Sequence, residues 1–498
     1  MSQQQFDVLI VGAGLSGIGM AVHLQRDCPG KTFAILEQRD DLGGTWDLFQ
    51  YPGIRSDSDM HTLGFDFEPW TEQKAIADGP SIWNYIHRIA KERDIEQHIR
   101  FGQKVSTAEW SSESALWTLE SVDGEGKRTR LSARYLYLAS GYYDYDKGHE
   151  PHFEGREEFG GQIVHPQFWP DDLDYLGKRV VVIGSGATAV TLVPSIAKKA
   201  AHVTMLQRTP TWYAIRPSED AIANGLRKVL PDNTAYKLIR KRNVLLQRFF
   251  FNRARSKPGK VGEFLHGKIR EALGGQMDEK DFTPPYNPWE QRLCLVPDAD
   301  MFEALKAGDA SIVTDHIDHF DETGIQLKSG EHLDADIIVT ATGLKLAVAG
   351  KIAFDIDGEP VNFADRIYYK GSMFSGIPNL AAVFGYVNAS WTLKADIVAR
   401  YFCRFINTVE ARVGDYAVPT LPANGSVEAE AAFDFSSGYF QRSMDILPKS
   451  GSRQPWKLNQ DYLLDRKILL KDPIDDGELV FHQAGQAEHA PPIMAAAE

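Results

Sequence analysis

The sequence predicts an α/β fold made of two Rossmann-like units and a mainly helical insertion. Two short apolar runs, at residues 6–11 and 179–183, each end in a glycine-rich turn that is followed by a helical stretch and a second strand. Two further strand-like runs both end in Ala-x-Gly, at 139–141 and 341–343. Because strand–turn–helix–strand units of this kind build parallel, doubly wound sheets, we expect one such sheet in each unit.

The order of these runs predicts how the 498 residues divide into domains. A chain of this length exceeds one ordinary hydrophobic core. The paired Ala-x-Gly ends indicate that the chain leaves the first unit and later returns to it. We therefore expect a discontinuous first domain, residues 1–145 and 346–498, and a second domain, residues 146–345, inserted into it.

The first glycine-rich turn has the form GxGxxG and the context that a dinucleotide site requires. Gly12 permits the tight turn, Gly14 lets a pyrophosphate approach the backbone, and Gly17 lets helix and strand pack closely. The predicted helix over 18–26 offers free N–H groups to the phosphates. Glu37 ends the second predicted strand, where a carboxylate can accept hydrogen bonds from a ribose with a free 2′-OH.

Two glycines and an indole follow soon after Glu37, in the run Gly43-Gly44-Thr45-Trp46. Such a backbone can pass close to a flat ring system, which favours FAD as the first dinucleotide. Strand-like runs at 104–110, 117–121 and 135–140 belong to the same domain. The residues predicted to contact FAD are Gly12, Gly14, Ser16, Gly17, Glu37, Gly44, Thr45, Trp46, Asp47, Arg55, Ser56, Asp57 and Val105.

The second turn has the related form GxGxxA, and its second strand, 202–207, ends differently from that of the first unit. Arg208 and Thr209 stand where the first unit has Glu37. An arginine can bind a 2′-phosphate bidentately, whereas a carboxylate would repel it, so we expect NADPH here and hydride transfer to the flavin. The residues predicted to contact NADPH are Gly184, Ser185, Gly186, Ala187, Thr188, Ala189, Val190, Arg208 and Thr209.

Residues 219–281 are predicted to form the mainly helical insertion within the second domain. Residues 226–270 hold thirteen Lys or Arg against two acids, although the whole chain has a formal charge of −14. The acidic total argues against nucleic acid as a partner. The basic insertion favours either a solvated cover over the active site or a surface that faces a membrane or a partner. Apolar and basic residues are mixed along the insertion, which favours the solvated cover over the active site.

Cysteine usage and the apolar runs predict a cytoplasmic protein, with membrane association through the insertion left open. Cys28, Cys294 and Cys403 form no CxxC pair, which indicates buried free thiols rather than disulfides or a thiol redox centre. No basic and apolar leader precedes the first strand, and no apolar run reaches the length of a membrane-spanning helix. We expect no secretory signal, no transmembrane helix and no metal site.

The segment between the two units carries the motif FxGxxxHxxxWP, from Phe159 to Pro170. This motif resembles the fingerprint of the type I Baeyer–Villiger monooxygenases, which belong to the flavin-containing monooxygenase superfamily. Its Trp-Pro ending favours this branch over the amine and sulfide oxygenases. The segments YPGIRSDSDM (51–60), YNPW (286–289) and NASWTLKAD (388–396) are most similar to the mycobacterial branch that activates the prodrug ethionamide.

The resemblance implies roles for three side chains. Arg292 matches the arginine that stabilises the negatively charged flavin peroxide, and Asp57 matches the carboxylate that orients this arginine. His165 matches the fingerprint histidine that links domain movement to catalysis. One position departs from the family, because Gln291 stands where the cyclic-ketone enzymes have a lysine for the 2′-phosphate. That departure leaves more of the NADPH selectivity to Arg208.

The resemblance also implies an NADPH- and O2-dependent reaction that inserts one oxygen atom into ketones through a C4a-peroxyflavin and gives esters or lactones. The protonated peroxide would instead oxidise sulfides. Three alternatives stay open: a sulfide or amine monooxygenase, a flavin reductase that inserts no oxygen, and a non-catalytic nucleotide sensor or membrane-associated scaffold. The sequence predicts neither the size of the substrate nor the oligomeric state.

Overall fold

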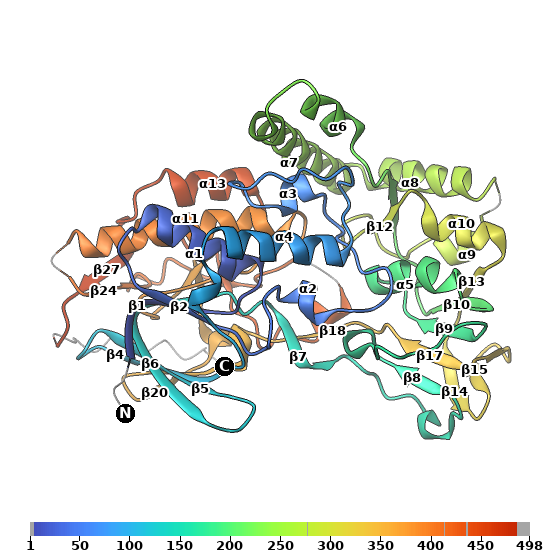
Figure 1. Cartoon of the computed structure of the whole chain (residues 1–498), viewed down its shortest axis with the longest axis horizontal. Helices are drawn as coiled ribbons and strands as arrows, with labels where there is room; N and C mark the ends of the chain where they lie inside the picture. Colours follow the sequence, from blue (N-terminus) through green and yellow to red (C-terminus); the bar gives the residue numbers. More distant parts are fainter. Residues whose placement is uncertain (1–3, 276, 413, 435–436, 486–498) are drawn as a thin grey trace.

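The computed structural model describes residues 4–275, 277–412, 414–434 and 437–485. Its two largest sheets lie side by side, at the left and the right of Figure 1, with helices above them. Among the described residues, no helix is long and apolar enough to cross a membrane. The three cysteines are buried free thiols, as predicted.

The first sheet has nine strands and takes them from both halves of the chain. Along the sheet the neighbours are β20, β19, β4, β5, β6, β1, β2 and β3, with β23 beside β6. Its parallel centre is β6, β1 and β2, and helices α1 (Leu15–Asp27) and α11 (Trp391–Glu410) pack in the core next to it. The strands are β1 (Gln4–Val11), β2 (Phe33–Leu36), β3 (Ile99–Arg100), β4 (Lys104–Ser111), β5 (Leu116–Val122), β6 (Arg128–Leu138), β19 (Ala353–Ile356), β20 (Glu359–Val361) and β23 (Leu380–Ala382).

The second sheet has five strands, all parallel, in the order β13, β10, β9, β17 and β8. Helix α5 (Ala187–Ala197) follows β9 and packs into the same core. The arrangement of both sheets confirms the predicted fold class of two Rossmann-like units with a helical insertion. The boundaries at 145/146 and 345/346 stay a prediction. The strands are β8 (Gln162–Val164), β9 (Arg179–Ile183), β10 (His202–Gln207), β13 (Ala310–Thr314) and β17 (Ile337–Thr340).

The predicted elements of the two units lie where the sequence places them, and the differences concern their ends. The helix predicted over 18–26 begins at Leu15, because its first turn lies inside the glycine motif, with Gly14 as the residue that caps it. The strand predicted over 135–140 is the last part of β6. This strand begins at Arg128, since it pairs with β5 in an antiparallel hairpin, and it ends at Leu138.

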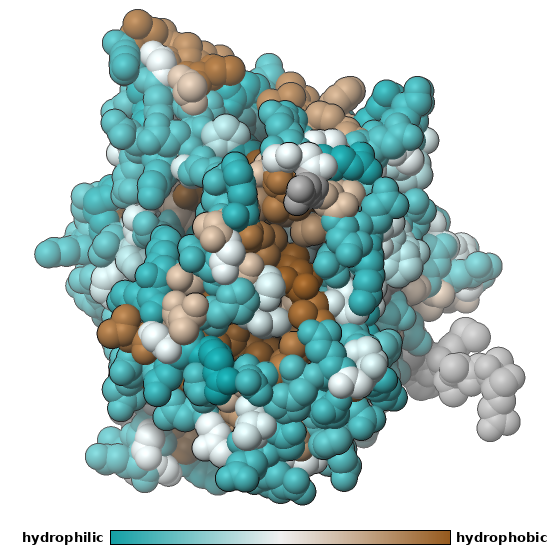
Figure 2. All heavy atoms as spheres, turned by 90° about the vertical axis from the view of Figure 1, so that its right-hand side faces the viewer, coloured by the Kyte–Doolittle hydropathy of each residue, from teal (hydrophilic) through white to brown (hydrophobic). Residues whose placement is uncertain are grey.

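The described residues of the predicted insertion form four helices: α6 (Ala221–Arg227), α7 (Asp232–Ser256), α8 (Pro258–Ala272) and α9 (Glu279–Phe282). The inner side of α7 is bound to the first domain. Arg240 donates hydrogen bonds to the carbonyl oxygens of His61 (3.0 Å) and Gly64 (2.7 Å), and Asn243 donates one to Asp59 (2.8 Å). Apolar side chains gather at the top of Figure 2, at the height where Figure 1 places α6 and α7.

Candidate active site

One cavity of about 1010 Å³ opens between the two glycine turns and is lined by residues of both units. It contains almost all of the side chains that the sequence predicts to bind the two dinucleotides, together with the predicted catalytic arginine and aspartate. The predicted residues that line it are Gly12, Gly14, Ser16, Glu37, Gly44, Thr45, Trp46, Arg55, Ser56, Asp57, Val105, Gly184, Ser185, Gly186, Ala187, Thr188, Arg208, Thr209 and Arg292.

The two glycine turns are built alike, and the Ala-x-Gly strand ends explain why. Gly12 has a φ of 103° and Gly184 a φ of 133°, both in the region that favours glycine. A Cβ on Gly12 would lie 2.5 Å from the carbonyl oxygen of Ala139, and one on Gly184 would overlap the carbonyl oxygen of Ala341. Each turn therefore passes directly against the strand that ends beside it, and no other residue fits there.

The residues of the first turn leave room for a dinucleotide. Glu37 accepts hydrogen bonds from the backbone N–H groups of Ala13 (2.7 Å) and Arg39 (3.0 Å), which hold its carboxylate at the cavity. Burial raises the pKa of this carboxyl. Each oxygen keeps a free lone pair for a ribose hydroxyl. A Cβ on Gly14 would lie only 3.4 Å from the Cα of Gly44, so bare backbone lines the channel at this point.

We expect Gly17→Ala to yield a protein that retains almost no FAD. A Cβ at Gly17 would overlap the carbonyl oxygen of Gly12, which is backbone and cannot rotate away, so α1 would have to separate from the turn. The flavin absorbance per mole of purified protein measures the effect. Gly225→Ala is the matched control, because nothing lies within 4 Å of a Cβ there. It should keep its flavin and gain up to about 1 kcal/mol of stability; equal flavin in both variants would contradict the prediction.

Arg292 faces the cavity together with Tyr142, Tyr143 and Tyr439. Burial disfavours the charge of the guanidinium, but Tyr142, Tyr439 and Asp57 outweigh this effect and raise the pKa of Arg292 above its ordinary value. The hydroxyls of Tyr142 and Tyr143 lie 2.6 Å apart and share a hydrogen bond. The cavity therefore holds a permanent positive charge surrounded by hydroxyl groups, and the sequence analysis did not identify the three tyrosines.

The segment that carries Arg292 is fixed by the insertion. Strand β12 (Cys294–Pro297) follows it and pairs in parallel with β11 (Tyr213–Arg216). Leu293 is buried in a cluster with Trp212 and with residues of α7 and α8. The insertion thus helps to set the position of the arginine.

Asp57 lines the same cavity as Arg292 but does not touch it. Burial raises the pKa of the Asp57 carboxyl, and the charges of Arg292 and Arg55 oppose that effect. Within the described residues, no hydrogen bond or ion pair joins Asp57 to Arg292, so the two interact through space. Arg55 forms an ion pair with Asp300, which ties the loop of Asp57 to the second unit.

Five predicted residues lie outside the lining of the cavity. Gly17 packs α1 against the first turn, and Ala189 and Val190 are fully buried where α5 packs on its sheet. Asp47 forms an ion pair with Arg39. His165 follows β8, its ring occupies the space that a Cβ on Gly148 would need, and burial lowers its pKa.

Arg208 faces the cavity near a second cation, Arg442, that the sequence analysis missed. Arg442 follows α12 (Gly438–Gln441), and its Nη2 lies 4.0 Å from the position of a Cβ on Gly343. Burial and the charge of Arg208 lower the pKa of Arg442. Among the described residues neither arginine has an ion-pair partner, so two like charges face one cavity. An anion bound between them would relieve this repulsion.

Two stacked aromatic rings line the cavity near the first turn. Trp391 stacks on Tyr142, with ring centroids 5.1 Å apart and an interplanar angle of 17°. Its indole N–H donates a hydrogen bond of 2.8 Å to Ser16. These residues lie far from each other in the sequence, so no local motif could have shown that they meet.

Known proteins are similar in sequence to this chain over almost its whole length. A family model described as "Flavin-binding monooxygenase-like" matches residues 5–226. The chain is 50% identical to the FAD-containing monooxygenase EthA of Mycolicibacterium smegmatis, over 96% of this chain and 97% of that protein. It is 48% identical to the probable FAD-binding monooxygenase AlmA of Acinetobacter baylyi, over 96% of each chain. The chain belongs to the flavin-binding monooxygenase family.

Solved structures share the fold of this flavin-binding monooxygenase. An oxidised steroid monooxygenase bound to NADP superposes with a TM-score of 0.75 at 23% identity, covering 96% of this chain and 100% of that chain. An open form of cyclohexanone monooxygenase gives 0.71 at 22%, covering 84% and 90%. The fold is therefore the one expected from the resemblance to Baeyer–Villiger monooxygenases. Family membership confirms the prediction of a flavoprotein monooxygenase.

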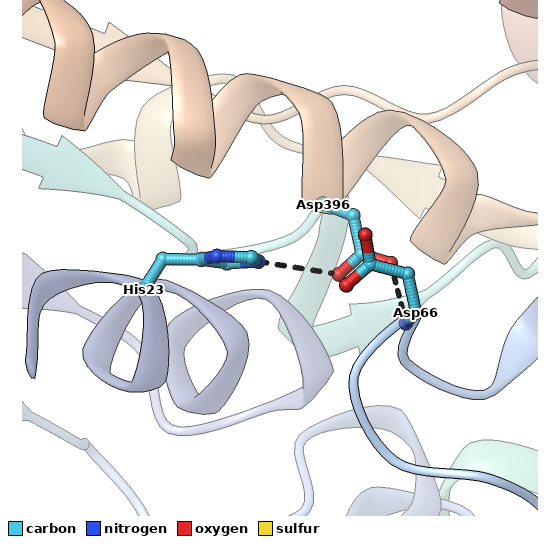
Figure 3. Close-up of side chains that lie close together, drawn as sticks. All are labelled: His23, Asp66 and Asp396. Atoms are coloured by element: carbon cyan, nitrogen blue, oxygen red, sulfur yellow. Dashed lines mark hydrogen bonds and ion pairs between the residues drawn. The ribbon is translucent and has the colours of Figure 1, made fainter. Parts of the chain in front are cut away.

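The described part of this monooxygenase holds one group of potential metal-ligating side chains, His23, Asp66 and Asp396, beside α1 and α11 (Figure 3). The Nε2 of His23 lies 3.6 Å from Asp396, and the Nη2 of Arg26 lies 2.8 Å from Nδ1. A guanidinium only donates, so in the neutral ring of His23 Nδ1 accepts and the proton sits on Nε2, facing the carboxylates. In the charged ring both nitrogens are protonated, and Nδ1 lies 3.7 Å from Asp27. Because a protonated nitrogen cannot bind a metal ion, we interpret this group as a buried ion network.

We expect His23 to make the stability of the protein depend on pH. Burial lowers the pKa of the imidazole, but Asp27 and Asp396 outweigh burial and raise the pKa above its ordinary value. A raised pKa stabilises the folded state below about pH 6.5, and this contribution is lost as the pH rises through the folded-state pKa. His23→Gln should therefore reduce the fall in unfolding free energy on going to alkaline pH, as measured by urea denaturation.

A histidine on the surface provides the control for this pH dependence. The side chain of His152 is 85% exposed, so His152→Gln should keep the wild-type pH profile. If His23→Gln also keeps the wild-type profile, the interpretation of His23 as a charged group of the core is wrong.

Proposed function

We propose that this flavoprotein is an FAD-dependent, NADPH-using Baeyer–Villiger monooxygenase that acts on small molecules. It inserts one oxygen atom of O2 into ketones to give esters or lactones, and it also oxidises sulfides. The observation that carries this proposal is the position of Arg292. Its permanently charged guanidinium lines the cavity between the two glycine turns. A reductase or a nucleotide sensor has no evident use for a fixed cation at this point.

The residues of the cavity fit both cofactors. The first turn and Glu37 would hold the adenosine part of FAD, and the second turn with Arg208 would hold NADP(H). When bound, FAD takes up hydride from NADPH and supplies the chemistry that activates O2. The hydroxyl of Ser185 donates a hydrogen bond of 2.9 Å to the carbonyl oxygen of Thr209, which keeps the second turn beside the predicted 2′-phosphate site.

Arg292 would stabilise the negative charge that develops on oxygen during its transfer to the carbonyl carbon. Its charge is already in place before the reaction, because Tyr142, Tyr439 and Asp57 favour it, so little reorganisation is needed at the moment of transfer. Trp391 and Tyr142 would exclude water from the same volume. Asp57 would act through space, since its carboxylate favours the charged form of the Arg292 guanidinium.

The domain division and the role of His165 are part of the same proposal. The first domain would comprise residues 1–145 and 346–498 and the second residues 146–345, since all strands of the second sheet lie between those of the first in sequence. His165 contacts Gly148, at the end of β7 (Tyr143–Gly148), rather than the cavity. This position supports a part in domain movement and not in proton transfer.

The product of the reaction tests the proposal. Purified holoenzyme is supplied with NADPH, ¹⁸O2 and a panel of linear ketones, cyclic ketones and thioethers, and the products are analysed by mass spectrometry. We expect esters or lactones that carry one ¹⁸O atom. NADPH oxidation that yields only hydrogen peroxide with every ketone would contradict the proposal, and sulfoxides without any ester would favour the sulfide monooxygenase alternative.

A further inference from the structure

The outward side of the helical insertion exposes many large apolar side chains. The described residues include thirteen large hydrophobic side chains that are exposed, and seven of these lie between residues 219 and 281. The top of Figure 2 shows apolar residues at this height of the molecule. We call these seven residues the insertion patch, and they are Ile222, Val229, Leu238, Leu245, Leu246, Phe249 and Phe264.

Helix α7 forms the centre of the insertion patch. Leu238, Leu245 and Phe249 are spaced by seven and four residues, which places them on one side of the helix. Their exposed fractions are 50%, 46% and 68%. Lys241 and Arg248 fall on the same stripe, at positions three residues after a leucine. Apolar and cationic side chains therefore alternate along one exposed side of α7.

The apolar side chains on this side of α7 are not part of the core, although Arg248 on the same stripe forms an ion pair with Asp461 (2.7 Å). The opposite side already supplies the contacts that anchor the insertion, through Tyr236, Ile239, Arg240 and Asn243, all of which are buried. The apolar side chains of the insertion patch thus remain in water without a role in the core, and large exposed apolar patches mark contact sites.

Several cations of the insertion have no partner within the described chain. Lys237, Lys241, Arg253, Lys257 and Lys260 are exposed, and no carboxylate in the described ranges forms an ion pair with them. The rest of the chain is strongly acidic. The insertion patch is therefore a local cationic and apolar surface on an anionic protein.

We propose that the insertion patch docks the protein onto the surface of a membrane that contains anionic lipids. Apolar side chains enter the boundary between head groups and acyl chains, while lysine stems lie along them and place their ammonium groups among lipid phosphates. A second copy of this chain is a poorer occupant, because two such patches would bring cations against cations. The observations thus favour a lipid partner over self-association.

Docking through the outward side of α7 leaves this helix between the membrane and the segment that carries the active-site arginine. Phe251 of α7 contacts Trp289 edge to face, with centroids 5.6 Å apart, and Leu293 packs against the insertion. Apolar substrates dissolved in the bilayer would then be close to the cavity. The docking itself does not depend on the proposed oxygen insertion, because vesicle binding and catalysis are measured separately.

Vesicle sedimentation of the holoenzyme tests the proposal. The vesicles consist of equal parts phosphatidylglycerol and phosphatidylcholine, or of phosphatidylcholine alone, in about 0.15 M salt. We expect the wild type to sediment with the anionic vesicles only. Leu245→Glu combined with Phe249→Glu should lower the partition coefficient at least about tenfold. Lys237→Gln combined with Lys241→Gln should lower it about fivefold per charge.

Matched substitutions elsewhere on the surface provide the controls. Leu176 is 68% exposed, as Phe249 is, so Leu176→Glu should leave vesicle binding unchanged. Lys127→Gln combined with Lys328→Gln tests the loss of two exposed lysines away from the insertion. NADPH oxidation without vesicles should be the same in all variants, which shows that each is folded.

Three results would overturn the proposal. The first is a wild-type protein that stays in the supernatant with anionic vesicles. The second is equal vesicle binding by the wild type and by the Leu245→Glu, Phe249→Glu variant. The third is a wild-type dimer in size-exclusion chromatography that this variant converts to a monomer while no vesicle binding is seen, which would make the insertion patch an interface between copies.

Discussion

Arg292→Ala is expected to lower the rate of ester formation at least about 100-fold while the protein keeps its flavin. The substitution removes the charge of Arg292 from the cavity and leaves Arg55 as the cation that acts on Asp57 there. Oxygen transfer then loses its electrostatic support, so NADPH oxidation should continue with hydrogen peroxide as the product. Gas chromatography of the ester and a peroxide assay on the same sample measure both quantities.

A second variant separates charge from geometry at this position, and a surface arginine provides the control. Arg292→Lys keeps the charge but loses the planar fork of donors, so its rate should lie between those of Arg292→Ala and the wild type. The control is Arg255 of the insertion, which forms an exposed ion pair with Asp434. Arg255→Ala should leave ester formation unchanged. Ester formation at the wild-type rate by Arg292→Ala would disprove the role given to this residue.

Coenzyme choice is expected to change by a similarly large factor when Arg208 is replaced. A charge-assisted hydrogen bond to a phosphate contributes about 1.5–3 kcal/mol, so Arg208→Gln should raise the Kd for NADP+ about 10- to 150-fold. The Kd for NAD+ should change little, because NAD+ has no 2′-phosphate. Arg442→Gln should show the same selectivity with a smaller effect, since Arg442 faces the same cavity next to Arg208. Isothermal titration of the holoenzyme measures both constants.

The double variant distinguishes one shared phosphate from two separate sites. If both arginines bind the same anion, the effects of Arg208→Gln and Arg442→Gln on NADP+ affinity should not be additive. Arg412 pairs with Asp475 on the surface, and Arg412→Gln provides a control that should bind both coenzymes normally. Equal losses of NADP+ and NAD+ affinity in Arg208→Gln would contradict the assignment of the 2′-phosphate.

The local parts of the site could be read from the sequence because they depend on backbone geometry over a few residues. Gly12 and Gly184 stand where the chain needs a positive φ and a close approach to a neighbouring strand. Glu37 and Arg208 stand at equivalent strand ends, so a single pair of positions is predicted to distinguish the two dinucleotides. The motif that ends in Trp169-Pro170 named the family in the same way, by short-range spacing.

The parts that could not be predicted depend on side chains that meet across long stretches of chain. Tyr439 and Arg442 reach the cavity from the C-terminal part, and Trp391 stacks on Tyr142 across the interior. Packing also separated Asp57 from direct contact with Arg292, although the family resemblance implied that the carboxylate orients the arginine. No periodicity or spacing carries information of this kind.

The sequence by itself determined the two dinucleotide-binding units of this protein, because each turn and strand end is specified by adjacent residues, and it predicts a different selectivity for each unit. Only the tertiary structure decided what fills the space between the units and which side of α7 faces water. Both depend on how distant segments pack, and packing decides whether a leucine such as Leu245 belongs to the core or to the surface.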